Sequence, residues 1–345
     1  MTRLKRLQAE LERPLLVTSA VNVRYLTGLK SSNTALLVER ERARLFTDFR
    51  YLSVARALEE VEVVGVGRDL LGELGRSLEG EVGFEPDALT VSGYEKLRAG
   101  GLELVASGGL VERMRAVKEE GELKLIRRAA AVTSEAFTRL GTEPFIGRSE
   151  RELAWRMREL FHELGAEGEA FSTIAASGPN SAFPHAEAGE RVVEAGELVV
   201  VDAGAVVDGY CADCTRTFAS GDPPERLLRA YAVCQSAQQA GLDALRAGAF
   251  ARDVDVAARA VIKESEFAGC FGHGLGHGVG LEVHEEPSLR PEAGEKRLEV
   301  GNVVTVEPGI YIEGLGGVRL EDLVCVGVSG VELLTSVPRE LVRVG

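Results

Sequence analysis

Four acidic residues stand in apolar, strand-like segments that would otherwise be buried. Asp202 interrupts LVVVDAGA, Asp213 lies in YCADCTRTF, Glu307 ends VVTVEPG and Glu321 sits in GVRLEDLVCV. A buried, ionised carboxylate costs several kcal/mol unless its charge is compensated. One such acid alone is more often a solvated loop residue or half of a buried ion pair. Four of them in strand-like contexts favour a shared site for cations.

The spacing of these acids agrees with one site. Asp202 and Asp213 are 11 residues apart across the bend VVDGY, which favours a β-hairpin that brings the two acids together. Arg319 and Glu321 are two residues apart, so in a strand both side chains face the same side. We therefore expect the first pair to lie close together and the second pair to share a face.

A glycine-rich segment adds histidines to this set. FGHGLGHGVGLEVHEEP contains His273, His277 and His284, three of the chain's five histidines within 12 residues. Its glycines allow the backbone to approach a ligand closely. A lone histidine is more often a structural hydrogen-bonding residue, whereas three in such a segment favour function. Donors that are mostly oxygen favour a harder divalent ion such as Mn²⁺ over a structural zinc, and several carboxylates suit two ions.

Length and charge restrict the class of protein. The chain has 345 residues, which exceeds what one hydrophobic core usually supports, so we expect two domains, 1–113 and 114–345. Acidic residues outnumber basic ones, 54 to 40, which argues against nucleic acid or anionic membrane as a partner. The start of the chain has no apolar signal-peptide stretch, and the five cysteines fit no disulfide framework, so we expect a cytoplasmic protein.

Hydrophobic periodicity predicts an α+β chain. In the first domain, strands are expected at 35–38 and 61–66 and a helix at 51–58. In the second domain, the expected helices are 118–140, 149–164, 224–247 and 253–264, and the expected strand-rich pieces are 198–218, 303–312 and 318–328.

These motifs together carry a family resemblance. VDAGA, ADCTRTF, GHGLGHGVGLEVHE, TVEPGIYI and GVRLEDLV resemble the pita-bread metallopeptidases, in particular the prolidase and Xaa-Pro aminopeptidase branch. NVRYLTGL (22–29) and TDFRYLSVA (47–55) resemble the creatinase-type amino-terminal domain of that branch. The resemblance implies a small α/β domain followed by a curved antiparallel sheet covered by helices, and it implies a homodimer. It implies five metal ligands: Asp202, Asp213, His277, Glu307 and Glu321.

The same resemblance implies roles for further residues. His185, in SGPNSAFPHA, would line the substrate site, and His284 would contact the substrate near the scissile bond. His273 would lie beside the proline pocket. Tyr311 and Arg319 also fall on family positions and would help to bind the substrate, with Arg319 also a partner of the ligand carboxylates.

The implied activity is hydrolysis of the Xaa-Pro bond by a dinuclear metallopeptidase, with dipeptides as the expected substrates. Glu307 would be the general base that takes a proton from a metal-bridging water, while His284 and His185 stabilise the developing charge. Mn²⁺ is the expected ion, with Co²⁺ and Zn²⁺ as alternatives. The alternative activity is an Xaa-Pro aminopeptidase acting on longer peptides, and a more remote alternative is a non-catalytic binding module.

One position departs from the family pattern. In familiar prolidases an arginine follows the HEEP string, whereas this chain has Ser288 there. Our hypothesis is that a cation elsewhere, Arg290 or Arg50, binds the proline carboxylate and keeps the protein a dipeptidase. The plainer interpretation of either arginine is an ordinary surface charge.

Overall fold

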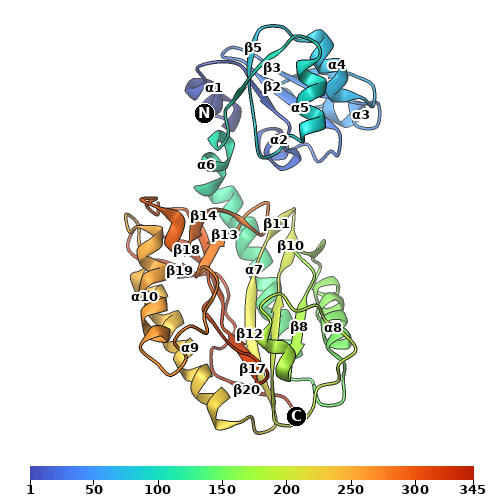
Figure 1. The fold of residues 1–345 in the computed structure, drawn as a ribbon. Coiled ribbons are helices and arrows are strands. Elements are labelled where there is room, and N and C mark those ends of the chain that lie inside the picture. The colour runs from blue at the N-terminus through green and yellow to red at the C-terminus, as the bar shows by residue number, and fades with distance from the viewer. The chain divides into compact units, whose positions relative to one another are not determined.

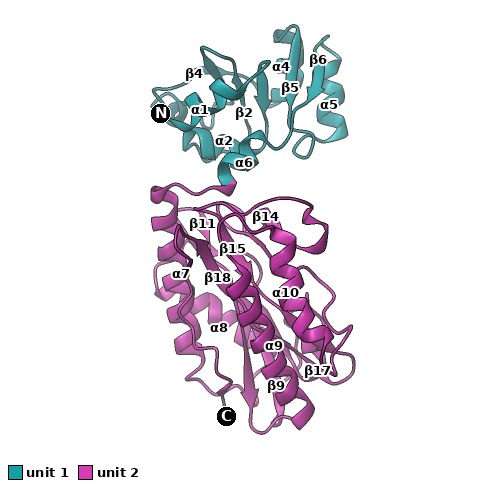
Figure 2. Cartoon of the chain, turned by 90° about the vertical axis from the view of Figure 1, so that its left-hand side faces the viewer, with its two compact units in different colours: residues 1–115 teal, residues 116–345 magenta.

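The computed structural model describes residues 1–345, which form two compact units, Met1–Arg115 and Ala116–Gly345 (Figure 2). The division falls at helix α6 (Leu110–Ala116), and the predicted boundary between residues 113 and 114 lies within that helix. No helix combines the length and apolar character needed to cross a membrane.

Unit 1 is built on a six-stranded mixed sheet with the strand order β4-β3-β2-β1-β5-β6. Its strands are β1 (Leu15–Val17), β2 (Thr34–Val38), β3 (Ala43–Thr47), β4 (Glu62–Gly65), β5 (Glu81–Phe84) and β6 (Glu103–Ala106). Its other helices are α1 (Arg3–Glu10), α2 (Ala20–Thr27), α3 (Leu52–Ala55), α4 (Leu70–Ser77) and α5 (Val91–Arg98). The pairs β3–β4, β1–β5 and β5–β6 are parallel, as the predicted α/β domain requires.

Helix α3 is shorter than the predicted helix 51–58. After Ala55 the chain tightens, because the amides of Ala57 and Leu58 donate to carbonyls only three residues back, those of Val54 and Ala55. The prediction of a two-turn helix was therefore wrong at its carboxyl end.

Four long helices flank the strands of unit 2. They are α7 (Glu120–Leu140), α8 (Glu150–Glu163), α9 (Glu225–Ala244) and α10 (Ala251–Lys263), and Figure 1 shows α9 and α10 along one side of the strands and α8 along the other. Ser149 begins α8 with a capping box: its hydroxyl accepts from the amide of Glu152, whose carboxylate accepts from the amide of Ser149. Helix α7 begins two residues later than predicted, because Lys118 is still extended and donates its amide to the carbonyl of Gly301.

The strands of unit 2 form two main sheets, with the orders β20-β12-β9-β8 and β14-β13-β15-β18-β19, and two small sheets, β11-β10-β7 and β16-β17. The strands are β7 (Gly168–Glu169), β8 (Ile174–Ser177), β9 (Glu197–Ala203), β10 (Ala205–Val207), β11 (Tyr210–Cys211), β12 (Cys214–Ser220), β13 (Gly276–Gly278), β14 (Glu285–Leu289), β15 (Val303–Val306), β16 (Gly309–Ile312), β17 (Gly316–Arg319), β18 (Asp322–Val326), β19 (Val331–Leu333) and β20 (Val342–Arg343). All pairs are antiparallel except β12 with β20. The predicted α+β class, with a helix-covered antiparallel carboxyl-terminal domain, is confirmed.

The strand-rich pieces predicted at 303–312 and 318–328 each contain a break between two strands. The first break falls at Glu307 and Pro308, where proline cannot donate to a ladder and the amide of Glu307 turns to the carbonyl of Leu275. The second falls before Asp322, where the amide of Glu321 turns to the carbonyl of Thr215. At each break the chain leaves one sheet and enters another, and an acidic residue, Glu307 or Glu321, lies at the crossing.

Gly276 in β13 marks the closest backbone approach in the glycine-rich segment. A Cβ at this position would lie 2.1 Å from the carbonyl oxygen of Thr305 on the neighbouring β15. A Cβ at Gly272, in the same segment, would meet nothing within 4 Å.

We predict that Gly276→Ala lowers the stability of the protein by about 1–3 kcal/mol, because β13 must move away from β15. Gly272→Ala is the matched control and should have a melting temperature near that of the wild type. Thermal denaturation of both variants checks this, and equal melting temperatures for the two variants would contradict it.

Candidate metal centre

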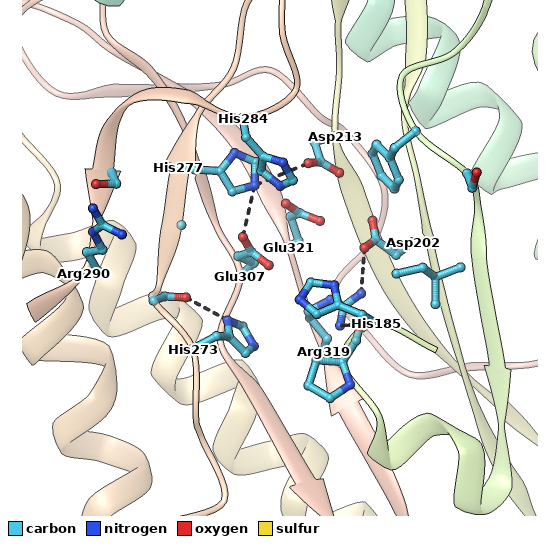
Figure 3. Close-up of a pocket in the computed structure, with 17 residues that line it drawn as sticks. His185, Asp202, Asp213, His273, His277, His284, Arg290, Glu307, Arg319 and Glu321 are labelled. Atoms are coloured by element: carbon cyan, nitrogen blue, oxygen red, sulfur yellow. Dashed lines mark hydrogen bonds and ion pairs between the residues drawn. The ribbon is translucent and has the colours of Figure 1, made fainter. Parts of the chain in front are cut away.

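One cavity of about 450 Å³ in unit 2 gathers most of the predicted site residues (Figure 3). Ten of them line it: His185, Asp202, Asp213, His273, His277, His284, Arg290, Glu307, Arg319 and Glu321. Ser288 also lines the cavity, whereas Tyr311 does not. Arg50 belongs to unit 1.

The predicted hairpin brings Asp202 and Asp213 to this cavity. Strands β9 and β12 pair antiparallel with Asp202 opposite Thr215, and the chain between them forms the β10–β11 hairpin. The turn of that hairpin has positive φ angles at Asp208 and Gly209, as a tight two-residue connection needs. The hairpin interpretation of the 11-residue spacing is confirmed.

Three of the predicted ligands have donor atoms close enough together to bind one metal ion. Donor atoms of Asp213, His277 and Glu321 all lie within 4.8 Å of one another. The Nδ1 atom of His277 lies 3.1 Å from the carbonyl oxygen of Gly278, so Nε2 is the nitrogen that faces the acids. That Nε2 atom is 3.6 Å from Asp213 Oδ2 and 3.3 Å from Glu307 Oε1.

Unpartnered carboxylate oxygens support a cation at this place. Asp202 Oδ1, Asp213 Oδ1 and Glu321 Oε1 are buried and accept no hydrogen bond. Buried charges are normally paired or bind metals, so these three oxygens fit divalent ions as ligands. The donor set of this cavity is therefore suited to hold metal.

Arg319 compensates only part of the negative charge. Its Nη2 atom lies 2.6 Å from Asp202 Oδ2, and its Nε donates to the hydroxyl of Thr215, 3.1 Å away. That hydroxyl donates in turn to Glu321 Oε2 at 2.7 Å. Arg319 and Glu321 thus share a face, as their spacing predicts, although they lie at a junction between two strands rather than in one.

Tyr311 does not line the cavity, but its hydroxyl contacts two residues that do, Arg319 and His273. Its hydroxyl accepts from Arg319 Nη1 at 3.0 Å and lies 2.9 Å from His273 Nε2. Its predicted role in binding substrate directly stays a prediction, and the contacts found here are with two residues that do line the cavity.

The carboxyl groups of the centre differ in proton affinity. Burial raises the pKa of Asp213 and of Glu321 well above the usual carboxyl range, and the nearby negative charges raise both further. Burial also acts to raise the pKa of Glu307, but the hydrogen bond and charge of His277 outweigh it and lower this pKa to about 2. Glu307 is therefore ionised at neutral pH.

Two histidines outside the predicted ligand set, His284 and His273, have pKa values below the usual imidazole range. Burial lowers the pKa of His284, and the charge of His277 lowers it further, since the two ring centroids are only 4.2 Å apart. Burial likewise lowers the pKa of His273. His185 lies in the segment whose Pro184 carbonyl accepts from Arg319 Nη1 at 3.1 Å.

The two candidate carboxylate-binding arginines differ in their surroundings. Arg290 is an exposed residue that lines the cavity and has no ion pair or side-chain hydrogen bond, and Figure 3 shows it to one side of the clustered acids. Arg50 forms a double hydrogen bond with the buried Asp48 of its own unit and lowers the pKa of that carboxyl. A substrate-binding role for Arg50 stays a prediction.

Two threonines of the site escaped the sequence analysis. Thr215 joins Arg319 to Glu321, and Thr305 accepts from the amide of His277 and lies 3.3 Å from Glu307 Oε1. Each is two residues from a predicted ligand, Asp213 or Glu307, so the two-residue period of a strand was a usable signal.

Comparison with known proteins gives consistent matches. The chain matches the models of Metallopeptidase family M24 over residues 124–327 and of the Creatinase/Prolidase N-terminal domain over residues 3–117. It is 40% identical over 232 residues to the Xaa-Pro dipeptidase of Pyrococcus furiosus, covering 67% of this chain and 66% of that protein. The solved Xaa-Pro dipeptidase from Bacillus anthracis matches with a TM-score of 0.93 and 36% identity over 98% of both chains. The X-Pro aminopeptidase from Thermotoga maritima matches with a TM-score of 0.87 and 33% identity, covering 97% of this chain and 99% of that one.

We predict that Asp213→Asn leaves a folded protein with at least about tenfold weaker binding of Mn²⁺, because it removes a charged ligand while nearly keeping its shape. Asp208→Asn, in the exposed hairpin turn, is the matched control. Calorimetric titration of metal-stripped protein checks this. Unchanged Mn²⁺ affinity in Asp213→Asn would remove Asp213 from the centre.

We also predict that the stabilisation conferred by Mn²⁺ grows with pH. The raised pKa of Asp213 and Glu321 means that the folded, metal-stripped protein holds protons that the unfolded chain loses above about pH 4. The metal-stripped protein therefore becomes less stable as the pH rises. Over the same range metal binding becomes stronger, because it needs ionised carboxylates.

The check is the difference in melting temperature with and without Mn²⁺, measured at about pH 5 and about pH 7. The difference should be larger at the higher pH. A constant or shrinking difference would contradict the assignment of these carboxyls as ligands.

Proposed function

The chain belongs to metallopeptidase family M24, and from this premise we propose that it hydrolyses the Xaa-Pro bond of dipeptides. The observation that carries the proposal is that one cavity contains both carboxylate oxygens without partners and Arg290, whose guanidinium has no ion pair. A dipeptide carries its carboxylate on the proline itself, so a cation in the same cavity as the acids suits this substrate. Family membership favours an enzyme over the non-catalytic binding module.

The proposed ligands are Asp202, Asp213, His277, Glu307 and Glu321, which would hold two divalent ions. When bound, such ions polarise a carbonyl and acidify water. Oxygen donors dominate the set, which supports Mn²⁺, with Co²⁺ and Zn²⁺ as alternatives.

The residues of the chain then have distinct tasks. Glu307, ionised at neutral pH, is the proposed general base that accepts the proton of the attacking water. His284 and His185 line the cavity as candidate hydrogen-bond donors to the substrate carbonyl as its oxygen becomes negative. His273 also lines the cavity, and we assign it to the wall of the proline pocket.

The proposed assembly is a homodimer in the cytoplasm. Phe49 and Val54 of unit 1 are 71% and 62% exposed, and contact with a second copy would cover such apolar side chains. Sedimentation of the purified protein tests this assembly.

The alternative activity is that of an Xaa-Pro aminopeptidase on longer peptides. It is favoured by Ser288, a neutral residue on the cavity wall where familiar prolidases have an arginine. The match to the X-Pro aminopeptidase of Thermotoga maritima supports it as well. The two activities differ in whether a free proline carboxylate is required.

We predict that Arg290→Ala raises KM for alanyl-proline about tenfold or more, because a carboxylate–guanidinium contact is lost, and that kcat changes less. Arg246→Ala, an exposed arginine outside the cavity, is the control. Kinetics on alanyl-proline and on alanyl-prolyl-glycine check this. If wild type cleaves the tripeptide as readily as the dipeptide and Arg290→Ala changes neither, the aminopeptidase is the correct activity.

A further inference from the structure

An ion pair on helix α10 lies outside the cavity and holds one of its walls. Asp255 and Arg259, one turn apart, join through two contacts of 2.8 Å, Nε to Oδ2 and Nη2 to Oδ1. The carboxylate is fully buried, and the guanidinium side chain is 30% exposed. Neither residue lines the cavity.

The pair binds the irregular segment 271–275 through its backbone. Arg259 donates from Nη1 to the carbonyl of Phe271 at 3.1 Å and from Nη2 to the carbonyl of His273 at 2.7 Å. Asp255 Oδ1 accepts from the amide of Leu275 at 3.0 Å. The guanidinium also lies 4.3 Å from the centre of the Phe271 ring. These backbone groups have no strand partner, so one ion pair supplies the hydrogen bonds that a sheet would otherwise provide.

The held segment forms part of the cavity wall. His273 and Gly274 both line the cavity, and Gly274 packs closely on β14 and the residue after it. A Cβ at Gly274 would lie 3.0 Å from Arg290 Cβ and 3.1 Å from the carbonyl oxygen of Leu289. A shift of this segment would therefore disturb the contact with Arg290 as well.

The same segment determines how the His273 ring is used. His273 Nδ1 lies 2.8 Å from the carbonyl oxygen of Gly274, which can only accept a proton. The neutral ring therefore carries its proton on Nδ1, and Nε2 accepts from the hydroxyl of Tyr311 at 2.9 Å. The position of one backbone carbonyl thus sets the tautomer and the direction of the ring.

We propose that Asp255 and Arg259 are positioning residues, which clamp segment 271–275 so that His273 and Gly274 present a fixed wall to the substrate. The clamp acts on substrate affinity and leaves the metal ligands in place. This inference rests on the proposed function for the identity of the substrate. Arginine is suited to the task because its planar fork reaches two carbonyls and a carboxylate at once, whereas lysine offers a single charged nitrogen.

The test compares Arg259→Met and Arg259→Lys with wild type, each loaded with Mn²⁺ and with its metal content measured. Arg259→Met should raise KM for alanyl-proline on the order of tenfold to a hundredfold, because small misplacements of binding groups have effects of that size. The value of kcat should stay within about twofold, the metal content should be unchanged, and Arg259→Lys should fall between the other two. Arg252→Met is the matched control, since Arg252 lies on the same helix and contacts only Asp253 and Phe250.

A purely structural role gives a different result. It would lower the melting temperature and the fraction of active enzyme, and hence the apparent kcat, while KM stayed at the wild-type value. That outcome would overturn the proposal, as would a loss of bound Mn²⁺ in Arg259→Met.

Hydrogen exchange supplies a readout that needs no substrate. Amides in residues 270–276 should exchange faster in Arg259→Met than in wild type, with little change elsewhere in unit 2. Unchanged exchange there would overturn the clamp. A wild-type protein that does not hydrolyse alanyl-proline would contradict the proposed function and not the clamp, which would then be judged by the exchange measurement alone.

Discussion

The repulsion among four clustered carboxylates, two of them buried and two largely buried, is the constraint on which the arrangement of unit 2 depends. Asp202 has Arg319 as a partner, and Glu307 has His277. Asp213 and Glu321 each have one carboxylate oxygen without any partner, and burial raises the pKa of each. A protein that needed only stability would replace such a group with apolar residues or pair each acid with a base. Keeping them together is understandable if cations complete the site.

A neighbouring acid shows what complete compensation looks like in the same fold. Asp322, the residue after Glu321, is equally buried but contacts two guanidinium groups, those of Arg216 and Arg339, at 2.7 and 2.6 Å. It also accepts from the hydroxyl of Thr335 and the amide of Gln238. The chain can therefore satisfy a buried carboxylate with its own groups where it is structural. The contrast between these two adjacent acids distinguishes a carboxylate that the chain itself compensates from one for which we propose a metal ion.

Much of this site was predictable, because its proposed ligands lie where strand patterns are interrupted. The 11-residue spacing and the Asp-Gly turn predicted the pairing of Asp202 with Asp213, and the structure has that hairpin. Pro308 signalled a strand end, but the continuous apolar pattern around it concealed the crossing between sheets. Such a crossing depends on distant partners, here the carbonyls of Leu275 and Thr215, which no local pattern contains.

The sequence did not predict contacts in which a side chain donates hydrogen bonds to the backbone of a distant segment. Arg259 looks like any charged residue on an amphipathic helix, four residues after an acid. Its contacts with the carbonyls of Phe271 and His273 exist only because α10 lies beside an irregular segment. Arg290 was predictable as a candidate only through the family resemblance. Its membership of the cavity wall became visible with the fold.

The most direct test of the central claim is anomalous X-ray scattering from crystals grown with Mn²⁺. We expect two anomalous peaks in the cavity, about 3.5–4 Å apart, ligated by Asp202, Asp213, His277, Glu307 and Glu321. If the protein hydrolyses Xaa-Pro dipeptides and its crystals show no peak among these residues, the proposed metal centre is wrong.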